Sequence, residues 1–250
     1  MKIILIPLFS IILLLSLLLL FDDYYYIYPI IYSFYTYLLL ISSIIGMIFA
    51  PLYIFMFKKN IKESKGAIDN ASGVSILIEL AKYYKHNPLK NYDILLLFCG
   101  GEEYGLKGSD YFCKKYMSYF AKQYDLKKSV NINIDMVGSH IGLLNKSPFS
   151  IFYRNKKLIH LINYSADLLD IPIDNYSKIL NPKSDNLSFK KHSRKVGERK
   201  FQNVCFNSVK DTKFIHTIMD TPEMCSIQNL FNCFRICLLT SQLLDSEIND

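Results

Sequence analysis

One stretch constrains this chain more than any other: an apolar run that ends in glycines and two adjacent carboxylates. The run, Ile94–Phe98, predicts a strand buried on both faces of a parallel sheet. Gly100 and Gly101 end it, and Glu102 and Glu103 follow. Open α/β sheets bind ligands beyond the carboxyl ends of their strands. Two carboxylates held together there repel each other unless a cation or a shared proton intervenes, so the stretch indicates a metal site. A solvated acidic loop is the alternative interpretation.

The remaining apolar patterns predict helices and strands in alternation. Helices are expected over four ranges: Gly66–His86, Ser109–Tyr124, Leu158–Leu169 and Met224–Leu244. Two further strands are expected, at Val130–Asp135 and Phe201–Phe206. The polar segment Lys183–Lys191 is expected to be a loop. This alternation predicts an α/β fold: a three-layer α/β/α sandwich with a mixed, mainly parallel sheet.

Two apolar runs precede this region. Ile3–Phe21 and Ile27–Phe57 are each long enough to cross a bilayer, because about 20 apolar residues span it as a helix. They predict two transmembrane helices, and therefore a membrane anchor over residues 1–60 before a second domain over residues 61–250. A signal peptide beginning at Lys2 is the alternative for the first run. Its length and the absence of a following Ala-x-Ala cleavage site favour a retained helix.

The charges around the two runs predict their orientation. The segment between them carries Asp22 and Asp23 and no basic residue, whereas lysines follow the second run at positions 58, 59, 62 and 65. Because positive charge is retained on the cytoplasmic side, both termini and the soluble domain are expected in the cytoplasm. The chain is thus predicted to be a multi-pass membrane protein whose partners include the lipid bilayer.

Charge and cysteine usage exclude other function classes. The formal net charge is +7, but the basic residues are scattered, and the cluster at Lys190–Lys200 has little aromatic interleaving. This pattern favours a solvated loop or lipid headgroup contact over nucleic-acid binding. The six cysteines show no paired zinc-ligand spacing, so reduced cysteines that pack in the core are expected.

Acidic and imidazole side chains recur at the ends of the predicted elements. Asp69 stands where the first predicted helix begins, Asp135 ends a predicted strand, and His216 precedes a turn near the C-terminus. Together with Glu102 and Glu103 they form a set of carboxylates and one imidazole without cysteine, which suits zinc in a hydrolase. Asp69 taken alone is more typical of a helix-capping residue than of a metal ligand.

Four segments resemble the successive signatures of the co-catalytic di-zinc aminopeptidases of metallopeptidase family twenty-eight, which also includes glutaminyl cyclases. They read GAIDNASGVSILIELA, FCGGEEYGLKGS, INIDMVGS and IHTIMDTPE. The similarity extends from about Gly66 to the C-terminus. It implies a zinc-exopeptidase-like fold, one or two zinc ions and a peptide substrate that is hydrolysed at its N-terminus.

The resemblance also implies a role for each matching residue. Asp69 would bridge two zinc ions, and Glu102 would act as the general base toward metal-bound water. Glu103 and His216 would bind one zinc ion, and Asp135 would bind the other. The acceptor expected to steady the imidazole lies four residues beyond it, at Asp220.

The sequence departs from the family pattern at two positions. The family has a further histidine ligand about a dozen residues before the bridging aspartate, where this chain has Phe57, and no histidine precedes His86. Asn186 stands where relatives often have histidine after Ser-Asp. His140 and His192 could substitute, although their spacing favours neither.

Two functions therefore follow from the sequence. The first is a membrane-anchored, zinc-dependent exopeptidase of the aminopeptidase type. The alternative is a catalytically degenerate homologue that keeps the fold and acts as a peptide- or partner-binding module.

Overall fold

The computed structural model describes residues 33–34, 36–38, 40–44, 64–144, 156–176 and 183–246. The chain divides into two compact units, residues 1–59 and 60–250. The described residues of the first unit are helical. No helix among the described residues is both long and apolar enough to cross a membrane. Of the two predicted transmembrane spans, Ile3–Phe21 lies outside the described residues and Ile27–Phe57 lies mostly outside them.

A four-stranded mixed sheet forms the centre of the second unit. Its strands are β1 (Val130–Ile134), β2 (Gly142–Leu144), β3 (Asp174–Tyr176) and β4 (Gln202–Phe206), in the order β1-β4-β2-β3. β4 runs parallel to β1 and antiparallel to β2, and β2 runs parallel to β3. Because Ile134 pairs with Phe206, β1 and β4 end at the same edge of the sheet. The predicted strands at 130–135 and 201–206 are confirmed.

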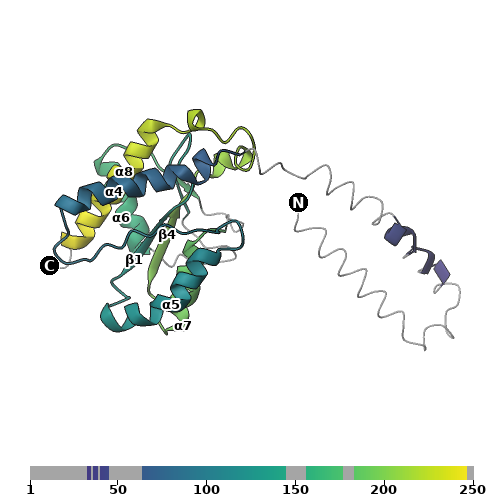
Figure 1. Ribbon diagram of the computed structural model, residues 1–250, viewed down its shortest axis with the longest axis horizontal. Coiled ribbons are helices and arrows are strands. Elements are labelled where there is room, and N and C mark those ends of the chain that lie inside the picture. Colours follow the sequence, from purple (N-terminus) through teal and green to yellow (C-terminus); the bar gives the residue numbers. More distant parts are fainter. Residues whose placement is uncertain are drawn as a thin grey trace. The chain divides into compact units, whose positions relative to one another are not determined.

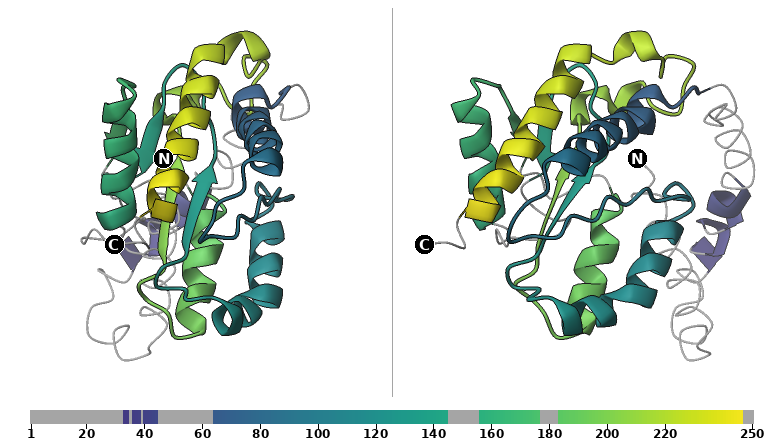
Figure 2. Two further views of the ribbon diagram at one scale, coloured as in Figure 1. Left: turned by 90° about the vertical axis from the view of Figure 1, so that its left-hand side faces the viewer. Right: turned by 60° about the vertical axis from the view of Figure 1, so that its left-hand side comes forward.

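Helices cover both faces of this sheet (Figures 1 and 2). α4 (Ser72–His86), α6 (Lys156–Leu168) and α8 (Ile227–Ser246) share the main hydrophobic core with the sheet. α5 (Lys107–Gln123) and α7 (Asn186–Lys195) pack against each other on the opposite face. The alternation of β4 explains both layers: Val204 and Phe206 enter the main core, whereas Asn203 and Cys205 face the segment that begins α7. The expectation of a mixed α/β fold is confirmed.

Three short helical turns carry the loops at one end of the second unit. They are η2 (Ala67–Ala71), η3 (Val209–Lys213) and η4 (Pro222–Met224). η2 and η4 lie in contact, although they come from opposite ends of the domain sequence. This contact brings the start of the domain to the C-terminal loops.

The prediction of a loop at Lys183–Lys191 was wrong, because α7 begins at Asn186. Its buried face is polar and small: Ser188, His192 and Ser193 are all buried. Ser188 is hydrogen bonded to Ser109 of α5 at 2.8 Å, and His192 lies 2.9 Å from Asp110 of α5. A helix that packs through serines and a histidine lacks the apolar periodicity by which sequence patterns reveal helices.

The prediction that Ile94–Phe98 is a buried strand was also wrong. The segment forms neither a helix nor a strand, and it pairs with no strand among the described residues. Leu96 packs against the main core, whereas Leu95 and Phe98 are 61% and 52% exposed. An apolar run indicates the β-strand propensity of the segment itself. It does not indicate whether neighbouring strands are present for it to pair with.

Gly108, in the first turn of α5, fixes the loop that follows this segment. A Cβ atom at Gly108 would lie 2.1 Å from the carbonyl oxygen of Gly100, so only glycine permits this approach. We expect Gly108→Ala to lower the free energy of unfolding by about 1–3 kcal/mol through overpacking. Gly100→Ala is the matched control, because its Cβ would meet nothing within 4 Å. Urea unfolding of both variants tests this, and equal midpoints would contradict it.

Candidate metal centre

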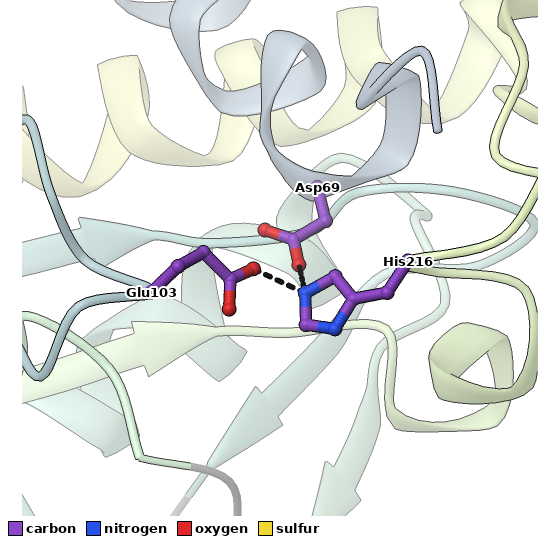
Figure 3. A group of neighbouring side chains, drawn as sticks. All are labelled: Asp69, Glu103 and His216. Carbon is purple, nitrogen blue, oxygen red and sulfur yellow. Dashed lines mark hydrogen bonds and ion pairs between the residues drawn. The ribbon is translucent and has the colours of Figure 1, made fainter. Parts of the chain in front are cut away.

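Three side chains from separate segments converge at the end of the second unit (Figure 3). Asp69 comes from η2, Glu103 from the loop before α5, and His216 from the loop between η3 and η4. Nε2 of His216 lies 3.3 Å from Oδ2 of Asp69, and the same nitrogen is hydrogen bonded to Oε1 of Glu103. One potential ligand atom of each residue lies within 4.8 Å of the others. The structure thus brings together three of the four predicted ligands.

Asp220 fixes the segment that carries Asp69. Its buried carboxylate accepts hydrogen bonds from the backbone N–H of Ile68 at 2.6 Å and from Ser64 Oγ at 3.4 Å. Among the described residues, the Asp220 carboxylate accepts these two hydrogen bonds. The predicted bond from the imidazole of His216 is not one of them. Asp220 therefore orients Asp69 through the backbone of η2.

Two residues of the site region have left-handed backbone conformations that are uncommon for non-glycine residues. His216 has φ +57° and Met136, which directly follows Asp135, has φ +72°. Such conformations cost roughly 1–3 kcal/mol each and cluster at functional sites, where the surrounding structure maintains them. Both places coincide with the residues that the sequence singled out.

Asp135 lies at the carboxyl end of β1 and is 8% exposed. Burial raises the pKa of its carboxyl group to about 7, against a hydrogen bond from Ser184 that lowers it. Ser184 in turn accepts a hydrogen bond from Asn133 Nδ2 at 2.7 Å. This chain of contacts holds the carboxylate toward the site.

The remaining carboxylates share the same electrostatic environment. Burial, together with the nearby charges of Asp135, Glu103 and Asp185, raises the pKa of Glu102 to about 8. Burial and the charge of Glu103 raise the pKa of Asp69 to about 6, although His216 opposes this shift. Each group thus resists ionisation, first because it is buried and second because its neighbours are also acidic.

A divalent cation would relieve this repulsion, and the donor set determines which cation fits. Carboxylate oxygens and one imidazole, without a thiolate, match the ligands that zinc accepts in hydrolytic sites. Asp69, Glu103 and His216 would hold the ion. Glu102 and Asp135 interact with the charges of Asp69 and Glu103 but are not part of the three-residue cluster.

Sequence reasoning missed Asp185, which lies at the start of α7. Its charge raises the pKa of Glu102, and its Oδ1 atom is buried without a hydrogen-bond partner in the described part of the chain. Burial raises the pKa of Asp185 itself, against hydrogen bonds with Ser109 and Cys99. The only sequence signal was the Ser184-Asp185 dipeptide, in a segment interpreted as a loop.

Neither of the two alternative histidines joins the cluster. His140 Nε2 is 2.9 Å from the hydroxyl of Tyr176, and its Nδ1 is 3.2 Å from Ser139 Oγ. His192 is occupied by Asp110. Within the described residues, His216 is therefore the one histidine of the metal-binding group.

Three convergent side chains that could hold a metal ion, beside an additional carboxylate on an α/β domain, are typical of the class of metal-dependent hydrolases. The profile of Peptidase family M28 matches residues 54–241, which is most of the chain. This protein belongs to that family.

Curated relatives match over shorter regions. Aminopeptidase YwaD of Bacillus subtilis (strain 168) is 36% identical over 89 residues, which are 35% of this chain and 18% of that protein. A protein named "Probable zinc metalloprotease" from Pyrenophora tritici-repentis (strain Pt-1C-BFP) is 35% identical over 122 residues, 48% of this chain and 27% of its own length. The matched regions thus span about a fifth to a quarter of these relatives. Family membership and these names support a metallopeptidase and imply zinc.

Solved structures share the fold. The aminopeptidase from Aneurinibacillus sp. strain AM-1 superposes with a TM-score of 0.54 at 24% identity, over 72% of this chain and 40% of that one. The glutaminyl cyclase from an Acidobacteriales bacterium gives 0.51 at 15% identity, over 73% of this chain and 63% of that one. At these identities the likeness establishes the architecture alone.

The raised carboxyl pKa values predict how pH affects the metal-free protein. Asp69, Asp135 and Glu102 bind protons in the folded state up to about pH 6, 7 and 8, whereas in the unfolded chain they release them near pH 4. The folded state therefore loses stability as pH rises through this window. With chelator present, we expect the melting temperature to fall between about pH 5 and about pH 8. Added zinc should raise the melting temperature most near pH 8. A metal-free melting temperature that rises across this range would contradict the prediction.

Proposed function

We propose that this protein is a zinc-dependent exopeptidase that removes residues from the N-termini of peptides. The observation that carries the proposal is the convergence of Asp69, Glu103 and His216 beside the half-buried carboxyl group of Glu102. Membership in Peptidase family M28 supports it. The three-residue cluster supports one firmly bound zinc ion.

The residues divide the chemistry between them. Bound zinc would polarise the scissile carbonyl and acidify a water molecule. Glu102 would accept the proton of that water and deliver it to the leaving amine. A cation bound nearby would favour the ionised form of Glu102, which a base requires and which burial and the neighbouring carboxylates oppose.

The missing histidine favours a second candidate. Position 57 is phenylalanine, so a second zinc ion beside Asp135 would lack its imidazole ligand. If hydrolysis requires both ions, the chain is a degenerate homologue that binds a peptide or a protein partner through the same surface. Assay of hydrolysis and zinc content on one sample separates the two candidates.

Glu102 and Glu103 are expected to have different roles. Glu102→Gln keeps the size of the side chain but removes the proton acceptor, so zinc should remain bound while turnover falls by about 100-fold or more. Glu103→Gln should instead lower the zinc content, because a neutral amide replaces a ligating carboxylate. Aminoacyl-arylamide hydrolysis and metal content by emission spectroscopy are the two measurements.

Glu79→Gln is the matched control, because Glu79 is exposed on α4 and forms an ion pair with Lys82 at 2.6 Å. It should change neither readout. If both site variants keep full zinc and the parent protein shows no hydrolysis, the catalytic proposal fails and the binding module replaces it.

A membrane anchor over residues 1–60, with the domain of residues 61–250 in the cytoplasm, remains a prediction from the sequence. Protease added to intact cells should leave the domain uncut, and the same protease should digest it once the cells are lysed. Digestion in intact cells would reverse the predicted orientation.

A further inference from the structure

Asn70 links the two acidic segments of the site. It follows Asp69 directly, and its side chain reaches the end of β1. Its Nδ2 donates to the carbonyl oxygen of Ile134 at 2.9 Å, and its Oδ1 accepts from the backbone N–H of Met136 at 3.2 Å. The amide therefore contacts the backbone on both sides of Asp135.

The same amide also closes the first turn of α4. Its Oδ1 accepts from the backbone N–H of Gly73 at 3.0 Å and from Ser72 Oγ at 3.3 Å. A Cβ atom at Gly73 would lie 2.5 Å from the carbonyl oxygen of Ile134 and 2.6 Å from Asn70 Oδ1. The first turn of α4 thus lies directly against the end of β1, with no room for a side chain at position 73.

These contacts require an amide at this position. The end of the side chain must carry both a donor and an acceptor. The carbonyl of Ile134 accepts a hydrogen bond, whereas the N–H groups of Gly73 and Met136 donate. Aspartate lacks the donor when ionised, and serine is too short to reach both sides. The contacts also fix the orientation of the amide, since the reversed amide would face each partner with the wrong group.

We propose that Asn70 is a positioning residue that sets the spacing between the carboxylates of Asp69 and Asp135. The proposal rests on the proposed function, because the spacing matters through the zinc ion that Asp69 would bind. It goes beyond helix capping, which explains the bond to Gly73 but not those to Ile134 and Met136. Partners of this kind, one step removed from a metal ligand, typically contribute 10–100-fold in metal affinity.

Asn70→Asp in the full-length protein tests this directly. The change keeps shape and acceptor but places an oxygen against the carbonyl of Ile134. Added negative charge alone would tighten cation binding, so weaker binding isolates the geometric effect. We expect zinc affinity, measured by competition with a chelator, to fall about 10–100-fold.

Asn163→Asp is the matched control. Asn163 of α6 also donates to a backbone carbonyl, that of Ile159 at 2.8 Å, but lies outside the site. It should leave zinc affinity unchanged. If Asn70→Asp lowers the melting temperature of the metal-free protein without weakening zinc binding, Asn70 is merely structural and the proposal is overturned.

Two further measurements keep the test decisive. Asn70→Ala, which adds no charge, replaces Asn70→Asp if the latter does not fold. In the unmodified, metal-free protein the amide hydrogens of Gly73 and Met136 should exchange slowly with solvent. Rapid exchange at both would overturn the positioning role of Asn70. This exchange needs no zinc. A parent protein that binds no zinc would therefore refute the proposed function, whereas the exchange measurement would still test the contacts of Asn70.

Discussion

Burial of neighbouring carboxylates is the constraint on which this structure depends. Asp69, Glu102, Asp135 and Asp185 all have raised pKa values, with burial as the largest cause. Ionised together and without a cation, they would oppose the fold that brings them together. A bound divalent cation reverses the sign of this interaction. The acidic cluster is thus a cost in the metal-free chain and a source of affinity for zinc.

The scaffold resists this repulsion through contacts that lie outside the cluster. Asp220 holds the backbone of η2, and Asn70 joins that segment to the end of β1. Gly108 allows α5 to approach Gly100, which fixes the acidic loop. His216 has a left-handed backbone conformation in the loop between η3 and η4. The contacts of Asp220, Asn70 and Gly108 each involve a backbone group, so none of them depends on whether Asp69, Glu102 or Asp135 is ionised.

The sequence predicted much of the site because metal ligands need particular residue types at the ends of elements. Asp69, Glu103 and His216 were identified in this way, and the structure brings them together. What failed depends on long-range packing. Ile94–Phe98 has the composition of a buried strand but lacks paired neighbours in the described structure, and α7 buries serines rather than an apolar stripe. β2 and β3 are three residues each, too short for a periodic signal. The bonds that Asn70 makes to Ile134 and Met136 join distant parts of the chain, so no local sequence pattern reveals them.

Zinc K-edge X-ray absorption of the zinc-loaded, full-length protein tests the central claim most directly. The site described here predicts a first shell of one imidazole nitrogen and carboxylate or water oxygens at about 2.0–2.2 Å, without sulfur. The chain carries six cysteines, all unpaired in the structure, so a thiolate site is a real competitor. A sulfur shell at about 2.3 Å, or a protein that retains no zinc at all, would contradict the account.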